Sequence, residues 1–369
     1  MPSRLTSRLA LFVAALRTTL AEQRRPSKSP TRILIAHHLL LGDTLMLTPL
    51  LAKLRAQYPA AEIVMTVRPE LVALYAQQPY GVIALPYDPQ QSASFAALRQ
   101  YQGFDLALIP GDNRYSWLAR ALNARWVVAF DGDYPAYKNW PIDTLIPFPK
   151  SPTTVADMMA RLIEGPAPAP YQPANWPAPP CNTFDLPDAP YVVLHVGAGN
   201  VLRRWQPEKW RALIDNLEAR GLRCVFSGGA SDREHIAEID PSTTRRSYAG
   251  ETDLPQLWHL LQNAQLLICP DTGIAHLGRI IGVPTVALFG QGSPVLFGAG
   301  EFWRDAPFQA VWLPDFPCRD QKVLFKRQAK WILRCSRTPS ECPEARCMMG
   351  IHVDPVLDAI DRLLNNARP

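Results

Sequence analysis

Three short polar turns in the second half of the chain carry residue types that bind phosphate. Each follows an apolar run: Gly197-Ala198-Gly199, Ser227-Gly228-Gly229 and Asp271-Thr272-Gly273. Glycine lets the backbone approach a ligand closely, and a turn that opens a helix gathers free N–H groups and the positive end of the helix dipole. The turns therefore predict a nucleotide-diphosphate site, and three ordinary tight strand-to-helix turns are the alternative.

Charged side chains near these turns could complete such a site. Arg203 and Arg204 follow the first turn, and a guanidinium suits bidentate contact with phosphate. His276 comes four residues after the threonine of the third turn, so both are expected on one face of a helix start, with the ring contacting phosphate. Asp232 or Glu234 could accept ribose hydroxyls, or could simply stabilise the first turn of a helix. The predicted donor-binding residues are Gly197, Ala198, Arg203, Arg204, Ser227, Gly228, Gly229, Asp232, Asp271, Thr272, Gly273 and His276.

The first half of the chain offers a carboxylate, Asp43, shortly after an apolar strand. Projecting into a cleft between two domains, it could take a proton from an acceptor hydroxyl as that oxygen attacks a sugar carbon. Its alternative role is a helix N-cap, which contributes about 1 kcal/mol. His37 and His38 are alternative bases.

Alternating strands and helices must position these residues. Apolar strand patterns in the first region cover Arg32–His37, Ala61–Val67, Gly81–Leu85, Phe104–Pro110 and Trp126–Phe130, with helical patterns such as Glu70–Gln77 between them. In the second region they cover Tyr191–Val196, Leu222–Ser227, Leu266–Cys269 and Pro284–Phe289, with helices such as Pro207–Arg220, Leu254–Asn263 and Ile274–Ile281. This alternation predicts two α/β domains, each a doubly wound parallel sheet of Rossmann-like type, facing across a cleft.

A proline-rich stretch marks the domain boundary. Residues 165–180 contain seven prolines and no periodicity, which is typical of a stiff, extended linker. We therefore expect a first domain over 31–164, a linker over 165–184, a second domain over 185–353, and a C-terminal helix and tail over 354–369. Substrate selection is expected from the loops 134–140 and 291–315.

The leader, residues 1–30, is basic and has apolar residues at helical spacing. It predicts an amphipathic helix at an anionic membrane surface, or a helix packed on the body of the protein. The net charge of +5 does not indicate nucleic-acid binding. Four cysteines cluster late in the chain without a Cys-x-x-Cys pair, so reduced thiols are expected and no metal site is predicted. They are Cys318, Cys335, Cys342 and Cys347.

The same motifs carry a family resemblance. Residues 31–35 with 41–51, including Gly42-Asp43-Thr44, resemble the amino-terminal motif of the bacterial heptosyltransferase-like glycosyltransferases, glycosyltransferase family 9. The three turns, Arg203-Arg204-Trp205 and the ending from Cys347 to Val356 are similar to that family's donor-domain motifs. Two positions depart from the family pattern: Arg203 stands where a lysine is common, and 37–40 lack the usual serine.

The resemblance implies a GT-B fold and an inverting, metal-independent transfer of a heptose from an ADP-activated donor to a lipopolysaccharide inner-core acceptor. It places the general base on Asp43 and the donor-phosphate motif on Asp271, Thr272, Gly273 and His276. No cofactor beyond the nucleotide-sugar substrate is implied. We expect a cytoplasmic monomer, peripheral on the cytoplasmic face of the inner membrane. The alternatives are a nucleotide-sugar epimerase or hydrolase of the same fold, and a non-catalytic nucleotide-sugar-binding relative.

Overall fold

The computed structural model describes residues 12–15, 25–188 and 190–366, and it divides the chain into two compact units. The first unit comprises residues 1–169 and 322–331, and the second comprises 170–321 and 332–369. Among the described residues, no helix is both long and apolar enough to cross a bilayer.

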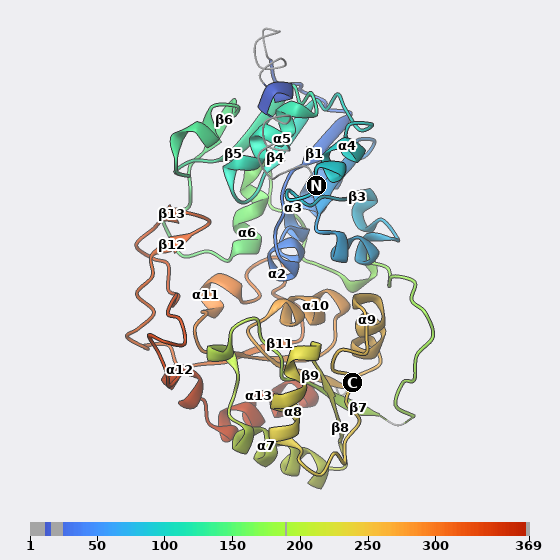
Figure 1. The fold of residues 1–369 in the computed structure, drawn as a ribbon, viewed down its shortest axis with the longest axis vertical. Coiled ribbons are helices and arrows are strands. Elements are labelled where there is room, and N and C mark those ends of the chain that lie inside the picture. The colour runs from blue at the N-terminus through green and yellow to red at the C-terminus, as the bar shows by residue number, and fades with distance from the viewer. Residues whose placement is uncertain (1–11, 16–24, 189, 367–369) are drawn as a thin grey trace. The chain divides into compact units, whose positions relative to one another are not determined.

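The first unit is built on a six-stranded parallel sheet with the order β3-β2-β1-β4-β5-β6 (Figure 1). The strands are β1 Arg32–Ile35, β2 Glu62–Val67, β3 Val82–Pro86, β4 Leu106–Ile109, β5 Trp126–Phe130 and β6 Thr144–Ile146. The short β6 was not predicted. Helices of this unit include α2 Leu41–Leu45, α3 Thr48–Gln57, α4 Ser92–Leu98, α5 Ser116–Ala121 and α6 Val155–Met159. From β1 the chain adds β2 and β3 on one side, and it then returns to add β4, β5 and β6 on the other side of β1. Doubly wound folds bind ligands at this switch point, between β1 and β4.

The second unit has a five-stranded parallel sheet with the order β11-β10-β9-β7-β8. Its strands are β7 Tyr191–His195, β8 Arg223–Ser227, β9 Leu266–Pro270, β10 Thr285–Phe289 and β11 Phe308–Trp312. The edge strand β11 lies in a stretch that the sequence indicated as a loop. A parallel bridge between Phe226 and Ser247 adds a vestigial strand beside β8. With that strand, the second sheet repeats the order of the first.

Helices cover both faces of the second sheet, as a doubly wound fold requires. α7 Pro207–Ala219, α8 Arg233–Ile239 and α13 Val353–Asn366 share one core with alternate residues of the strands. α10 Gly273–Ile281 lies on the other face, where Gly278 is so close to Leu267 and Thr285 that a Cβ would meet their side chains at 2.8 and 2.5 Å. α9 Leu254–Gln262 contacts α10. The two doubly wound α/β units predicted from the sequence are therefore confirmed.

Two segments differ from their predicted form. The stretch expected as a helix over Glu70–Gln77 is a 3₁₀ helix, η1 Pro69–Tyr75, which begins at Pro69 and ends four residues before Pro79. The proline-rich linker is anchored on the second unit from Pro170 onwards. Tyr171 donates from its hydroxyl to the carbonyl of Ile280 at 2.8 Å, and the buried Trp176 packs on Trp258.

In the sequence, the segment 322–331 lies between two stretches of the second unit, but it belongs to the first unit. It forms a hairpin of β12 Val323–Leu324 and β13 Arg327–Gln328. The guanidinium of Arg327 is buried and donates to the carbonyls of Gly111, Phe130 and Asp131 and to the side chain of Asn113. The second domain, expected over 185–353, is thus interrupted by a segment that belongs to the first unit. No sequence pattern indicated this interruption.

Of the basic leader, residues 12–15 and 25–30 are described, and residues 12–15 are helical. Ala15 is fully buried in the core of the first unit, and the ring of Phe12 lies 4.8 Å from that of Trp117. The leader's basic residues Arg4, Arg8, Arg17 and Arg24 lie outside the described residues.

Candidate functional site

The carboxyl edge of the second sheet gathers the three predicted turns. Residues 197–199 follow β7, 227–229 end β8 and begin the next turn, and 271–273 follow β9. These three strands are neighbours in the order β9-β7-β8, and the sheet order reverses between β7 and β9. The turns that follow β7 and β9 therefore flank the switch point, where this fold binds its ligands.

The third turn opens α10. Thr272 is its N-cap, and the Thr272 hydroxyl accepts from the N–H of Ile274 at 3.3 Å. Gly282, in the left-handed conformation with φ of 85°, ends the helix directly after Ile281, the last residue of the predicted helix. The first N–H groups of a nine-residue helix thus lie next to the glycine turn after β7, and they carry the positive end of the helix dipole.

Arg203 connects these two turns. It ends a short 3₁₀ helix, η7 Val201–Arg203, and its Nη1 donates to the carbonyl of Asp271 at 2.8 Å. The Nε of Arg203 is buried and, among the described residues, has no hydrogen-bond partner. A buried donor without a partner is costly, so a ligand oxygen at this position would be bound favourably. The arginine at the position where the family commonly has lysine is therefore fixed in place through Nη1, with its Nε–H still available.

Asp271 is itself buried, and its Oδ2 lies 4.0 Å from Nη1 of Arg203. Burial raises the pKa of Asp271, and the charges of Arg203, Arg279 and Arg334 offset part of that rise. The carboxylate packs directly on Gly292, where a Cβ would stand 1.9 Å from Oδ2. Gly292 follows β10 and was missed from the sequence, although a glycine after the fourth strand of the unit was a signal that could have identified it.

His276 does not present a free ring. It is buried in α10, and its Nδ1 is hydrogen bonded to Nη2 of Arg279. Burial, followed by the charges of Arg279 and Arg203, lowers the pKa of His276 well below its ordinary value. The imidazole is therefore neutral at neutral pH. Because Nδ1 accepts from Arg279, the ring proton is on Nε2.

Asp232 is engaged inside the protein rather than at the surface. Its Oδ1 pairs with Arg204 at 3.1 Å, and its Oδ2 accepts from the N–H of Gly229 at 2.9 Å. A Cβ on Gly197 would stand 2.3 Å from the same Oδ2. His195, at the end of β7, adds a contact between its Nδ1 and the hydroxyl of Ser227 at 2.9 Å. These contacts connect the turn after β7 to the turn after β8.

In the first unit, Asp43 is half-buried in the first turn of α2, directly after β1 at the switch point. The N-cap of this helix is Leu40, so Asp43 does not have the capping role that was its alternative. His37 is buried, and its Nδ1 accepts from the N–H of Leu39 at 3.1 Å. Burial, with a smaller effect of His38, lowers the pKa of His37 to about 3. Such a ring is a poor base, which favours Asp43 over His37.

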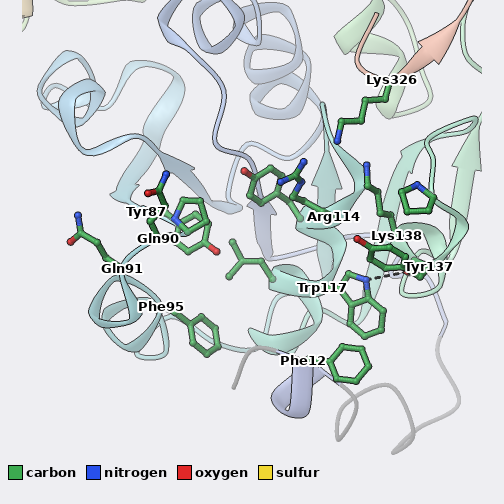
Figure 2. Close-up of a pocket in the computed structure, with 14 residues that line it drawn as sticks. Phe12, Tyr87, Gln90, Gln91, Phe95, Arg114, Trp117, Tyr137, Lys138 and Lys326 are labelled. Carbon is green, nitrogen blue, oxygen red and sulfur yellow. Dashed lines mark hydrogen bonds between the residues drawn. The ribbon is translucent and has the colours of Figure 1, made fainter. Parts of the chain in front are cut away.

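A pocket of about 500 Å³ lies within the first unit, and most of its lining is aromatic or apolar (Figure 2). Three cations, Arg114, Lys138 and Lys326, are also part of the lining. The loop expected to select substrate, 134–140, contributes Pro135, Tyr137 and Lys138, and the other residues were not found from the sequence. They come from distant segments, including the hairpin, and no motif joins them.

The four late cysteines line a second pocket, of about 360 Å³, in the second unit. All are free thiols. Burial, together with the proximity of Cys318, raises the pKa of Cys347 to about 11, so this thiol is protonated at neutral pH. As they are placed, the described histidine, cysteine and carboxylate side chains contain no group of three that could hold a metal ion.

Comparison with known proteins places this geometry in a family. The model of glycosyltransferase family 9 (heptosyltransferase) matches residues 92–323, more than half of the chain. A lipopolysaccharide heptosyltransferase 3 of Escherichia coli is 26% identical over 76% of this chain and 89% of its own.

Solved structures share the fold. A family 9 glycosyltransferase of Veillonella parvula superposes with a TM-score of 0.69 at 18% identity, covering 91% of this chain and 98% of its own. An ADP-heptose lipopolysaccharide heptosyltransferase II of E. coli gives 0.68 at 18% identity, covering 92% and 100%. The fold is of the GT-B type, with two Rossmann-like units. The chain belongs to glycosyltransferase family 9, the heptosyltransferases, and is a glycosyltransferase.

Proposed function

We propose that this enzyme transfers a heptose from ADP-heptose to an inner-core acceptor of a lipopolysaccharide precursor, with inversion at the sugar carbon. The second unit binds the donor, and Asp43 of the first unit is the general base. The names of its relatives support the proposal, since one is a lipopolysaccharide heptosyltransferase 3 and another is an ADP-heptose heptosyltransferase.

The observation that carries the proposal is the anchored Arg203 beside the start of α10. Its Nη1 is held by the carbonyl of Asp271, while the buried Nε has no partner among the described residues. A diphosphate here would accept from Nε and from the first N–H groups of the helix. These groups neutralise the charge that develops on the leaving ADP, so transfer proceeds without a metal ion.

The other turns shape the donor site. Gly197 and Gly228 lie so close to Asp232 that a Cβ would meet its side chain at 2.3 and 3.1 Å, and the pairing of Asp232 with Arg204 holds the turns together. With Ala198 and Gly229, these turns would line the nucleotide. Asp232 thus acts by positioning the turns that contact the donor. The neutral His276 would donate from Nε2 to a phosphate oxygen.

Asp43 takes the proton of the acceptor hydroxyl as that oxygen attacks the anomeric carbon and ADP leaves from the opposite side. A carboxylate suits this step because it is ionised at neutral pH and has two oxygens that accept hydrogen bonds. The enzyme would act as a monomer, peripheral on the cytoplasmic face of the inner membrane, where such acceptors are embedded.

Calorimetry with ADP-heptose tests the donor site directly. Replacing Arg203 by glutamine should weaken ADP-heptose binding by about tenfold to a hundredfold, because a charge-assisted hydrogen bond to phosphate is lost. Thr272→Ala and His276→Ala should each weaken it severalfold. Arg211→Gln is the matched control, because this arginine on α7 donates to Glu208 of the same helix and to the carbonyl of Glu238 on α8. Unchanged affinity in Arg203→Gln would remove the basis of the donor assignment.

A further inference from the structure

The second pocket is lined by four reduced thiols, and two of them come from segments that lie side by side. In an antiparallel bridge, the N–H of Gln321 donates to the carbonyl of Arg334 at 3.0 Å, so the residues before 321 run beside those after 334. The Nη1 of Arg337 contacts both segments, because it donates to the carbonyl of Cys318 at 2.6 Å and to the sulfur of Cys335 at 3.7 Å. The thiols of Cys318 and Cys335 are also hydrogen bonded to each other.

The surroundings of these two thiols differ. Burial, followed by the neighbouring Cys335, raises the pKa of Cys318, so this thiol keeps its proton at neutral pH. The sulfur of Cys335 accepts from the backbone N–H of Arg337 at 3.4 Å as well as from its Nη1. N–H donors and a guanidinium stabilise negative charge on sulfur, and the thiolate is the form that attacks an oxidant. Cys335 is therefore suited to attack, and Cys318 is placed to close a disulfide with it.

The segment that carries Cys335 is hydrogen bonded to the loop after β10. The N–H of Cys335 donates to the carbonyl of Gln291 at 2.9 Å, and the side-chain amide of Gln291 donates to the carbonyl of Arg337 at 3.1 Å. Gln291 is buried and directly precedes Gly292, which lies against the carboxylate of Asp271. A displacement of Cys335 would therefore reach the proposed donor site through two consecutive residues of this loop.

Closing a disulfide requires such a displacement. The two sulfur atoms of a disulfide are about 2.05 Å apart, which is closer than two hydrogen-bonded thiols can come. Cys318 is half-buried and Cys335 is buried, and both line a pocket of about 360 Å³, which gives a small oxidant access to them. The segments around Cys318 and Cys335 would then approach each other, and the hydrogen bond of Cys335 to Gln291 would move with them.

We propose that Cys318 and Cys335 form a reversible disulfide, with hydrogen peroxide as the oxidant, and that this disulfide weakens donor binding through Gln291 and Gly292. The thiolate of Cys335 attacks one peroxide oxygen, the O–O bond breaks, and hydroxide leaves and takes up the proton that Cys335 released. The product at Cys335 is a sulfenic acid. The sulfur of Cys318 then attacks this sulfenic sulfur, so the S–S bond forms, the S–O bond breaks, and water leaves with the proton of Cys318. The two thiols lose two electrons, and peroxide is reduced to two molecules of water.

Peroxide treatment of the full-length enzyme, followed by thiol titration under denaturing conditions and peptide mapping, tests the disulfide itself. We expect two of the seven thiols to be lost, with a link between Cys318 and Cys335 that dithiothreitol reverses. Cys318→Ser should instead accumulate a sulfenic acid on Cys335 that dimedone traps, and Cys335→Ser should form no link. Cys181→Ser, at an exposed cysteine outside the pocket, is the matched control and should lose two thiols as the parent does. A link between another pair of cysteines would overturn the proposal.

Calorimetry with ADP-heptose on the oxidised and reduced forms tests the effect on the donor site, which rests on the proposed function. We expect the oxidised parent to bind ADP-heptose about fivefold more weakly, with recovery after dithiothreitol. Cys335→Ser should bind equally well before and after peroxide treatment. Equal affinity of the two parent forms would overturn this inference alone, and leave the transferase assignment standing. Absence of binding to the reduced parent would instead contradict the proposed function, and the donor effect with it.

Discussion

The imidazole of His195 is buried at the end of β7 against the hydroxyl of Ser227. Burial, opposed in part by Asp232, lowers the pKa of His195 to about 4. Because this folded pKa lies below that of the unfolded chain, about 6.5, the contribution to stability is complete above pH 6.5 and is lost as the pH falls towards 4. The shift corresponds to about 3 kcal/mol.

We therefore expect the free energy of unfolding to fall between pH 6.5 and 4, and to fall less steeply in His195→Asn. Urea unfolding at a series of pH values measures the slope. His352→Asn, at an exposed histidine, should retain the parent slope. Superimposable slopes for the parent and His195→Asn would show that His195 does not titrate as its burial requires.

Charge neutralisation by Arg203 and the start of α10 leads to a prediction about metal removal. If these groups counter the diphosphate charge, treatment with EDTA should leave the rate of heptose transfer unchanged, and added Mg²⁺ should not raise it. Rates before and after dialysis against EDTA measure this. A loss of transfer that Mg²⁺ restores would assign the neutralising role to a metal ion instead.

Among the helices and strands, the sequence predicted best those whose hydrophobic residues follow a clear pattern. Buried strands such as β7 and β9, and the span of α10, could be predicted because apolar runs and the turn Asp271-Thr272-Gly273 are local signals. The strand β11 and the hairpin could not. β11 is partly buried along most of its length, and the hairpin depends on Arg327 binding carbonyls almost two hundred residues earlier in the sequence.

In the candidate donor site, too, local features were predicted from the sequence and long-range contacts were not. The three turns are each identified by glycines after a strand, and they meet because parallel strands end at one edge. Gly292 was missed although it follows a strand, because a glycine is required there by a long-range contact with Asp271. Likewise, the buried pairing of His276 with Arg279 follows from tertiary packing.

The contact between Gly292 and Asp271 makes the loop after β10 sensitive to one added methyl group. Gly292→Ala would place a Cβ 1.9 Å from Oδ2 of Asp271, so either the loop or the carboxylate must move. We expect a loss of stability of about 1–3 kcal/mol and weaker ADP-heptose binding. Gly199→Ala, where nothing lies within 4 Å, should change stability by less than about 0.5 kcal/mol. Equal urea midpoints for the two variants would show that the loop tolerates the methyl group.

At the scale of the whole molecule, the leader is attached to the first unit through the helical residues 12–15. Because Ala15 is fully buried in that core, deleting residues 1–30 would damage the unit as well as remove charge. Replacing Arg4, Arg8 and Arg17 by glutamine is the sharper test of membrane association. We expect weaker binding to phosphatidylglycerol vesicles, and a smaller dependence on salt, in the substituted chain. Identical binding in co-sedimentation at low salt would refute a role for the leader charges.

The most direct test of the account compares transfer with donor binding in Asp43→Asn, which keeps the size of the side chain and removes its charge. The acceptor-dependent formation of heptosylated product from ADP-heptose should fall by at least about a hundredfold, while calorimetric affinity for ADP-heptose stays within about twofold of the parent. A parent enzyme that consumes ADP-heptose equally without acceptor would indicate an epimerase or hydrolase. Full transfer by Asp43→Asn would contradict the assignment of Asp43 as the base.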